Sequence, residues 1–150
     1  GDGVYNFNHT TFANYWTGGD RKTPSIFLQN AYVNINGATV ISDLTAANFN
    51  NCIIDGDQEI EFSPETVSGG TINFNINHCA LKTTSSTAGS NYVNVLVNPG
   101  NLFVDRTLHD YHLNASSAAI NRGDNSLGVA TDHDGTPRSD GAPDLGAYEQ

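Results

Sequence analysis

Two aspartates near the C-terminal end of the sequence, Asp132 and Asp134, are spaced so that both carboxylates could bind one cation. Calcium takes about six to eight oxygen ligands, and closely spaced aspartates often supply them. The complete calcium-loop pattern is absent, because Thr136 stands where a third ligand belongs and no glutamate closes the loop. A calcium site at Asp132 and Asp134 is therefore one interpretation, and apart from it we expect no cofactor.

The same carboxylates also suit a structural role, because Arg138 is a lone cation in an acidic neighbourhood. A guanidinium can form a bidentate pair with a carboxylate and so fix one segment of chain against another. The candidate partners are Asp132, Asp134, Asp144 and Glu149. We favour this pinning of the C-terminal segment over the metal site.

Catalytic groups are harder to find. Glycoside hydrolysis needs two carboxylates about 5–10 Å apart, and Asp55 with Asp57 could satisfy this, as many surface pairs do. β-Elimination from a polysaccharide needs a base and a cation that stabilises the enolate. None of the six basic residues stands beside a convincing acidic cluster. We assign no catalytic residue to this chain and leave open whether it belongs to an enzyme.

Aromatic side chains favour binding instead. Trp16, Tyr15 and Tyr32 are candidates for stacking on sugar rings, and the many Asn and Asp side chains could bind sugar hydroxyls. Nineteen of the 150 residues are asparagine. The alternative is that these aromatics are ordinary packing residues at the bases of loops.

Short strands with one buried face must position these side chains. Apolar and polar residues alternate over 33–36, 72–77 and 93–97, which is the period of a strand. No segment shows a convincing helical stripe, and the nearest, 44–47, is too short.

The strands recur with a regular spacing. The pattern apolar, any, Asn or His, small, any, apolar begins at Phe7, Leu28, Phe49 and Ile76, with spacings of 21, 21 and 27 residues. A period in the low twenties is typical of one turn of a solenoid. One column of the alignment contains His9, Asn30, Asn51 and His78. We expect these side chains to form a structural ladder at the bends between strands.

The next column aligns Cys52 with Cys79. They could form a disulfide or remain buried thiols, and we favour thiols because neighbouring parallel strands orient their side chains alike. Stacked coils of short strands predict an all-β fold, a parallel β-helix of about four to six coils over residues 1–105. Residues 106–150 are predicted to form a capping tail packed on the last coil.

The C-terminal segment carries four motifs: 110–113 (DYHL), 117–123, 131–138 (TDHDGTPR) and 144–149 (DLGAYE). This succession resembles the terminal region of bacterial right-handed parallel β-helix proteins with a choice-of-anchor Q domain, within the pectate-lyase-like superfamily. Ala118 stands where that family has proline, and Asn121-Arg122 where it has Asp-Ala.

The resemblance implies a right-handed β-helix that is secreted or displayed on the bacterial cell surface. The expected function is a non-catalytic module that contacts a polysaccharide or cell-surface glycan, or acts as an adhesive or structural segment. Because the superfamily includes lyases and glycoside hydrolases, the alternative is the C-terminal fragment of such an enzyme with its catalytic coils upstream.

Charge and hydropathy exclude other partners. Six basic and sixteen acidic residues give a net charge of −10, which disfavours nucleic acid and anionic membranes. No apolar run of about 18 residues predicts membrane insertion. The first repeat begins almost at residue 1, so we expect the open N-terminal coil to contact further coils or another molecule.

Overall fold

The computed structural model describes residues 2–139 and 141–150, and this part of the chain is all-β without an α-helix. It contains three parallel sheets, which we call the first, second and third sheet. The first sheet contains, in order, β1 (Val4–Asn8), β6 (Leu44–Asn50), β9 (Ile72–Asn77) and β11 (Tyr92–Val93). The second contains β2 (Thr11–Asn14), β7 (Ile53–Gly56), β10 (Ala80–Leu81) and β12 (Leu96–Val97). The third contains β3 (Ile26–Gln29) and β8 (Phe62–Glu65).

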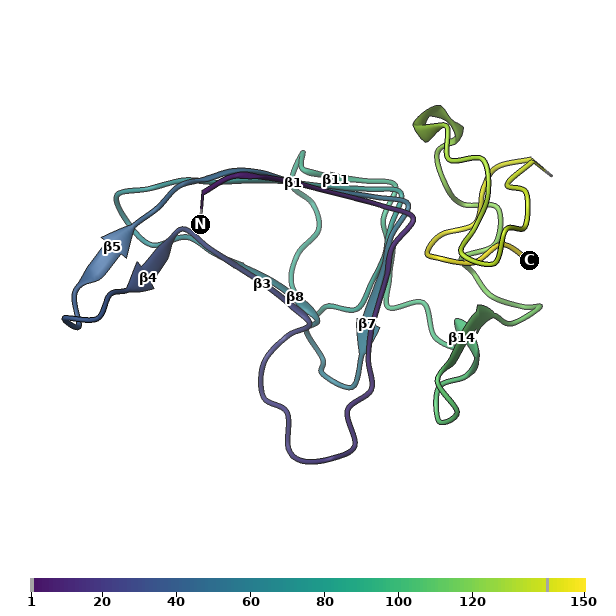
Figure 1. The fold of residues 1–150 in the computed structure, drawn as a ribbon, viewed down its shortest axis with the longest axis horizontal. Coiled ribbons are helices and arrows are strands. Elements are labelled where there is room, and N and C mark those ends of the chain that lie inside the picture. Colours follow the sequence, from purple (N-terminus) through teal and green to yellow (C-terminus); the bar gives the residue numbers. More distant parts are fainter. Residues whose placement is uncertain (1, 140) are drawn as a thin grey trace.

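The chain visits these sheets in a repeating order. β1, β2 and β3 lie in the first, second and third sheet, and β6, β7 and β8 visit the same three in the same order. β9 with β10, and then β11 with β12, repeat the first two sheets. We call each such round a passage. Successive passages pair through parallel strands, and Figure 1 shows the three sheets as three sides around a common interior.

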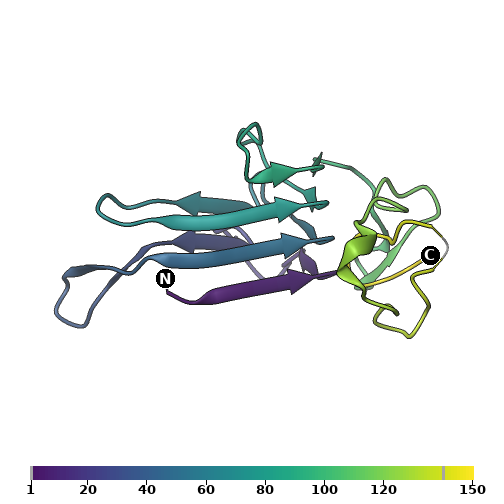
Figure 2. The same cartoon turned by 90° about the horizontal axis from the view of Figure 1, so that it is seen from above.

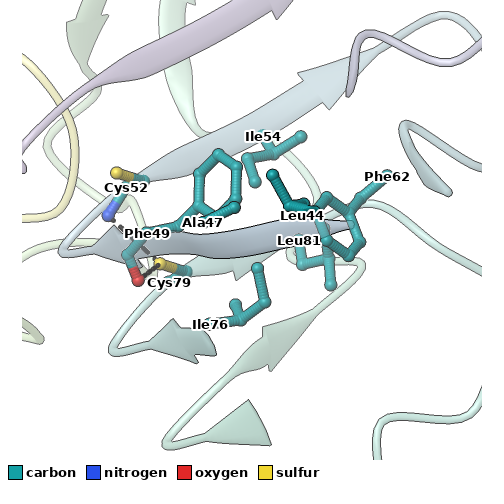
Figure 3. Packing of buried hydrophobic residues seen from close by; sticks show 9 residues of the cluster. All are labelled: Leu44, Ala47, Phe49, Cys52, Ile54, Phe62, Ile76, Cys79 and Leu81. Carbon is teal, nitrogen blue, oxygen red and sulfur yellow. Dashed lines mark hydrogen bonds between the residues drawn. The ribbon is translucent and has the colours of Figure 1, made fainter. Parts of the chain in front are cut away.

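The main core lies in that interior and receives side chains from all three sheets. Phe49 comes from the first sheet, Ile54 from the second and Phe62 from the third, and all three are fully buried (Figure 3). The rings of Phe7 and Phe49 stack from one passage to the next with centroids 5.0 Å apart. Burial of such apolar side chains, at about 25 cal/mol per Å² removed from water, is the main force that holds the passages together.

The two cysteines lie side by side in this core as free thiols. Cys52 and Cys79 are both buried, and the Cys52 backbone N–H donates a hydrogen bond to Cys79 Sγ at 3.3 Å (Figure 3). The single S–H of each thiol lies within hydrogen-bond distance of two backbone carbonyls, one of its own bend and one of the neighbouring passage. The thiols therefore act as small apolar residues whose weak hydrogen bonds are satisfied.

The observed register corrects the expected 21-residue repeat. Phe7 pairs with Phe49 and Phe49 with Ile76, but Leu28 pairs with Pro64 in the third sheet. The first passage takes 42 residues because a long loop and a hairpin interrupt it, so the apparent midpoint falls on a different side of the molecule. Leu28 still points toward the core, which explains why its pattern mimics the others.

The bends between the first and second sheets are left-handed. His9, Asn51, His78 and Asn94 each separate a strand of the first sheet from a strand of the second, with φ between 48° and 53°. Asparagine tolerates this conformation better than most residues, because its short polar side chain bonds locally. This placement explains part of the asparagine excess.

Two hairpin-like segments and a tail surround the sheets. β4 (Ala31–Val33) pairs antiparallel with β5 (Thr39–Ile41), and β13 (Phe103–Asp105) with β14 (Asp110–Leu113). A 3₁₀ turn, η1 (Asn125–Leu127), follows. Within the described part of the chain, no helix has the length and apolar character needed to cross a membrane.

The position of the tail is also corrected. We expected residues 106–150 to cap the last coil, but described residues of this segment pack on the outer face of the second sheet and across several passages. Leu145 joins Ile53 and Ala80 in a second apolar cluster, and the Gly146 N–H donates to the Asn51 carbonyl at 2.8 Å. Figure 2 shows the tail beside the ends of the stacked strands. The tail packs there because the outer faces of β7 and β10 present apolar side chains that it buries.

Candidate glycan-contacting surface

Trp16 lies on the long loop, residues 15–25, that joins β2 to β3 and projects from the body of the molecule (Figure 1). Its indole is exposed, with 60% of the residue surface accessible. The ring lies close to Gly18, where a Cβ atom would come within 2.5 Å of it. The indole lines a shallow hollow together with Asn14, Gly19, Asp20 and Arg21. The hollow therefore presents one large apolar face among polar side chains.

A buried ion pair fixes this loop. Arg21 donates two hydrogen bonds to Glu61, from Nη1 to Oε2 at 2.9 Å and from Nη2 to Oε1 at 2.5 Å. The Ser25 hydroxyl donates to the same carboxylate at 2.7 Å. Arg21 also donates to the backbone carbonyls of Asn14 and Thr23, at the two sides of the loop. The loop is thus closed at its base by a single carboxylate.

Glu61 is charged in this environment. Burial opposes its ionisation, but the hydrogen bonds from Arg21 and Ser25 outweigh burial and hold its pKa below the ordinary value. The pairing joins residues 40 positions apart. No spacing rule links the two residues, so sequence reasoning missed the pair.

Tyr15, the neighbour of Trp16, is held in packing contacts. Its hydroxyl donates to Asp55 Oδ2 at 2.5 Å, and its ring stacks on that of Tyr111 with centroids 6.2 Å apart. The guanidinium of Arg106 lies 4.9 Å from the ring centroid. Burial and the bond to Asp55 raise the pKa of the Tyr15 hydroxyl far above its ordinary value. Tyr15 therefore anchors the base of the loop.

Tyr32 lies elsewhere. It belongs to β4, and the β4–β5 hairpin projects from a different part of the molecule than the Trp16 loop (Figure 1). Its side chain is exposed, with 55% of the residue surface accessible. The structure does not bring the three expected aromatics together, and Trp16 alone combines exposure with a polar hollow.

Asparagine side chains form ladders on the outer face of the first sheet. The amide of Asn48 donates to Asn6 at 2.8 Å, and that of Asn75 donates to Asn48 at 3.0 Å. A second ladder joins Asn50 to Asn8 at 3.0 Å. Because the register is parallel, like residues repeat about every 4.8 Å from strand to strand. The face is a flat, regular array of amides.

The side chains at the bends between the first and second sheets, which we call the bend column, also contact one another. The Asn51 amide lies 3.0 Å from His9 Nε2, and the Asn94 amide lies 2.8 Å from His78 Nε2. Asn51 is fully buried and also exchanges two hydrogen bonds with the backbone of Asp124 in the tail. His9, Asn51 and His78 thus form part of one structural column.

Asn30, which we expected in that column, has a different role. It is buried near the end of β3, and its amide exchanges two hydrogen bonds with the backbone of Val67, at 2.7 and 3.0 Å. These side-chain hydrogen bonds take the place of backbone pairing where the third sheet ends. The structure separates it from the bends because Leu28 belongs to the third sheet.

The expected tail contacts are brought together in part. Arg138 Nη1 donates to Glu149 Oε2 at 2.6 Å, and both side chains are buried. The guanidinium also donates to the backbone carbonyls of Asp144 and Gly146. The buried Asp144 carboxylate accepts from the backbone N–H groups of Asn121 and Gln150. These bonds fold the last residues into a compact clasp.

Asp132 and Asp134 have different partners. Asp132 accepts backbone N–H bonds from Asp134, Thr136 and Glu149, which shape its own turn. Asp134 lies 3.0 Å from Nε2 of His112, on β14, so it links the tail to the β13–β14 hairpin. Asp134 and Asp110 raise the pKa of His112. In the described residues, no group of three or more His, Cys, Asp or Glu side chains is arranged to bind a metal ion.

The chain matches no protein-family model, and comparisons with curated proteins and with solved structures likewise found no match.

Proposed function

We propose that the chain is a right-handed parallel β-helix of the choice-of-anchor Q type. Two features support this: the repeating visits of the chain to three parallel sheets, and the four C-terminal motifs that resemble that family. The finer assignment, including the handedness and an extracellular or bacterial cell-surface location, is part of this proposal.

We propose further that this chain is a non-catalytic module that contacts glycans through Trp16. The single observation that carries the proposal is an exposed indole beside polar groups, on a loop clamped by the buried Arg21–Glu61 pair. An aromatic face packs against the apolar face of a sugar ring, and Asn14 and Asp20 can bind its hydroxyls. A pre-organised loop loses little conformational entropy on binding, which favours affinity.

Binding to a glycan array and to insoluble polysaccharides tests this function. We expect the wild-type chain to be retained by at least one polysaccharide without releasing sugars. Trp16→Ala should abolish retention, and Trp16→Phe should keep part of it, because an aromatic face remains. Tyr32→Ala is the matched control, since it removes another exposed aromatic away from the hollow. Wild-type retention by the Trp16→Ala variant would contradict the proposal.

A second candidate function rests on a different observation. The outer edges of β1, β2 and β3 have no neighbouring strand in the described chain, and a cavity of about 390 Å³ opens there beside Phe7 and Phe12. Further coils stacked on this end could carry the active site of a polysaccharide lyase or glycoside hydrolase. This candidate predicts turnover only in a longer polypeptide, measured as the release of sugars from polysaccharide.

A further inference from the structure

The basic residues divide into two groups. Among the described residues, three of the six cations form ion pairs: Arg21 with Glu61, Lys22 with Asp20, and Arg138 with Glu149. In the same part of the chain, Lys82, Arg106 and Arg122 have no carboxylate within 4.0 Å. Sixteen acidic residues are available in the sequence. Three cations in the described part of this acidic chain therefore lack a carboxylate partner.

Two of these three cations line the same cavity. Lys82 and Arg106 border a space of about 170 Å³ beside the ends of β7 and β10, closed on another side by residues 98–102. The sequence separates them by 24 positions, and the β13–β14 hairpin brings Arg106 to the second sheet. The fold thus gathers positive charge at a concave place on an otherwise acidic molecule.

Both cations are held in position by uncharged partners. The Lys82 ammonium donates to the backbone carbonyl of Gly56. The Arg106 guanidinium lies over the Tyr15 ring. These contacts orient the two groups without neutralising them. Each keeps donors available for a ligand, because a guanidinium has five N–H groups and an ammonium has three.

The one carboxylate in the cavity is already engaged. Asp55 Oδ2 accepts from the Tyr15 hydroxyl, and Oδ1 accepts from the Gly56 N–H at 2.8 Å. Asp55 therefore holds Tyr15 under Arg106. With Lys82, Arg106 and Asp55 all charged, the lining carries one net positive charge.

We propose that this cavity binds an oxyanion, such as a sulfate, phosphate or carboxylate group, held by Arg106 and Lys82. A planar guanidinium matches two oxygens of such a group, and the ammonium supplies a second charge. A partly enclosed site strengthens these interactions relative to open water. The cavity is separate from the Trp16 hollow, so this site goes beyond the proposed glycan contact and does not depend on it.

Titration of the full chain with inorganic sulfate at low ionic strength, followed by calorimetry, tests the site. We expect saturable binding with one sulfate per chain that weakens as salt is added. Arg106→Gln should weaken it by about tenfold or more, because a hydrogen bond to a charged group is lost. Arg106→Lys should retain part of the affinity. Lys22→Gln is the matched control: it removes the same charge from an exposed pair and should bind like the wild type.

Further arms distinguish the source of the anion and the two proposals. A sulfated monosaccharide that binds more tightly than inorganic sulfate would identify an anionic sugar as ligand, whereas equal affinities would identify the free anion. The unsulfated sugar should not bind at this site. Trp16→Ala should leave sulfate binding unchanged, so failure of the glycan proposal would not affect this result. Absence of saturable sulfate binding, or equal losses in Arg106→Gln and Lys22→Gln, would overturn the site.

Discussion

His9 shows how the bend column makes stability depend on pH. The side chain is buried beside the tail, and burial together with the positive charge of Arg138 lowers its pKa from 6.5 to about 4. The folded chain therefore binds fewer protons than the unfolded chain between these two values. The contribution of neutral His9 to the free energy of unfolding is therefore fully present above pH 6.5 and is lost as the pH falls toward 4.

The variant His9→Asn tests this dependence. Asn51 and Asn94 occupy equivalent bends with positive φ, so asparagine suits the position. Protonation of His9 should cost the wild type on the order of 3 kcal/mol between pH 6.5 and 4, by about 1.4 kcal/mol per pKa unit. The variant should lose less stability over this range. Urea unfolding at pH 7, 5.5 and 4 measures the difference, and parallel pH profiles for the two proteins would rule out the role of His9.

Single residues were predictable where their chemistry repeats. The 27-residue spacing from Phe49 to Ile76 is a true pairing, and it placed Asn51 and His78 correctly at successive bends. Asn30 was misplaced because inward-facing apolar residues followed by a buried asparagine occur on two different sides of the molecule. Composition alone does not distinguish one corner from another.

At the scale of elements, the loop that carries Trp16 depends on one ion pair. Arg21 and Glu61 are nearly inaccessible to solvent, with 11% and 0% of their side-chain surfaces exposed. Removing one member leaves an unpaired charge in a buried site, whereas replacing both removes the need for a partner.

We expect Arg21→Met to lower the free energy of unfolding by about 3–5 kcal/mol, as for other broken buried pairs. The double variant Arg21→Met/Glu61→Met should recover part of this loss, because no buried charge remains. Denaturant unfolding gives both values. A double variant that is no more stable than the single variant would show that Glu61 acts mainly through Ser25 and Gln58, which also donate to it.

Alternation of apolar and polar residues over 72–77 and 33–36 indicated extended chain. The first of these is β9, but 33–36 extends past β4 into the turn of the hairpin. The loop base was not predictable, since its geometry depends on a buried Glu61 carboxylate that meets Arg21 and Ser25 rather than solvent. The position of Glu61 follows from tertiary packing, which local sequence patterns do not reveal.

At the scale of the whole molecule, the clasp formed by the last residues of the tail also packs against the side of the stacked strands. Gly146 has φ 84°, and a Cβ atom there would come within 2.5 Å of Thr11 Oγ1 and 2.9 Å of Ile53. The next residue donates its backbone N–H to Thr11 Oγ1 at 3.0 Å. Glycine at this position therefore permits the close approach of the tail to the first two passages.

Gly146→Ala should destabilise the chain by about 1–3 kcal/mol, through strain at positive φ and steric contact with Thr11. Gly128→Ala is the matched control, since Gly128 also has positive φ but no neighbour within 4 Å. It should cost about 1 kcal/mol. Hydrogen exchange should accelerate in β1 and β2 of the Gly146 variant. Unchanged protection of these strands would show that the clasp does not stabilise them.

The tail illustrates what was predictable for the molecule as a whole. Its motifs marked it as a distinct segment, and Arg138 with Glu149 was among the expected pairs. Its position was not predictable, because the apolar outer face of the second sheet consists of single residues such as Ile53 and Ala80. In the sequence these residues cannot be told from those of the main core.

The clasp also has a kinetic consequence. The contact between Ala147 and Thr11 joins residues 136 positions apart, whereas strands of adjacent passages pair within about 42. Distant contacts form slowly, and a chain is synthesised from its N-terminus. The contact of the tail with Thr11 should therefore form late in folding, after β2 has paired with β7.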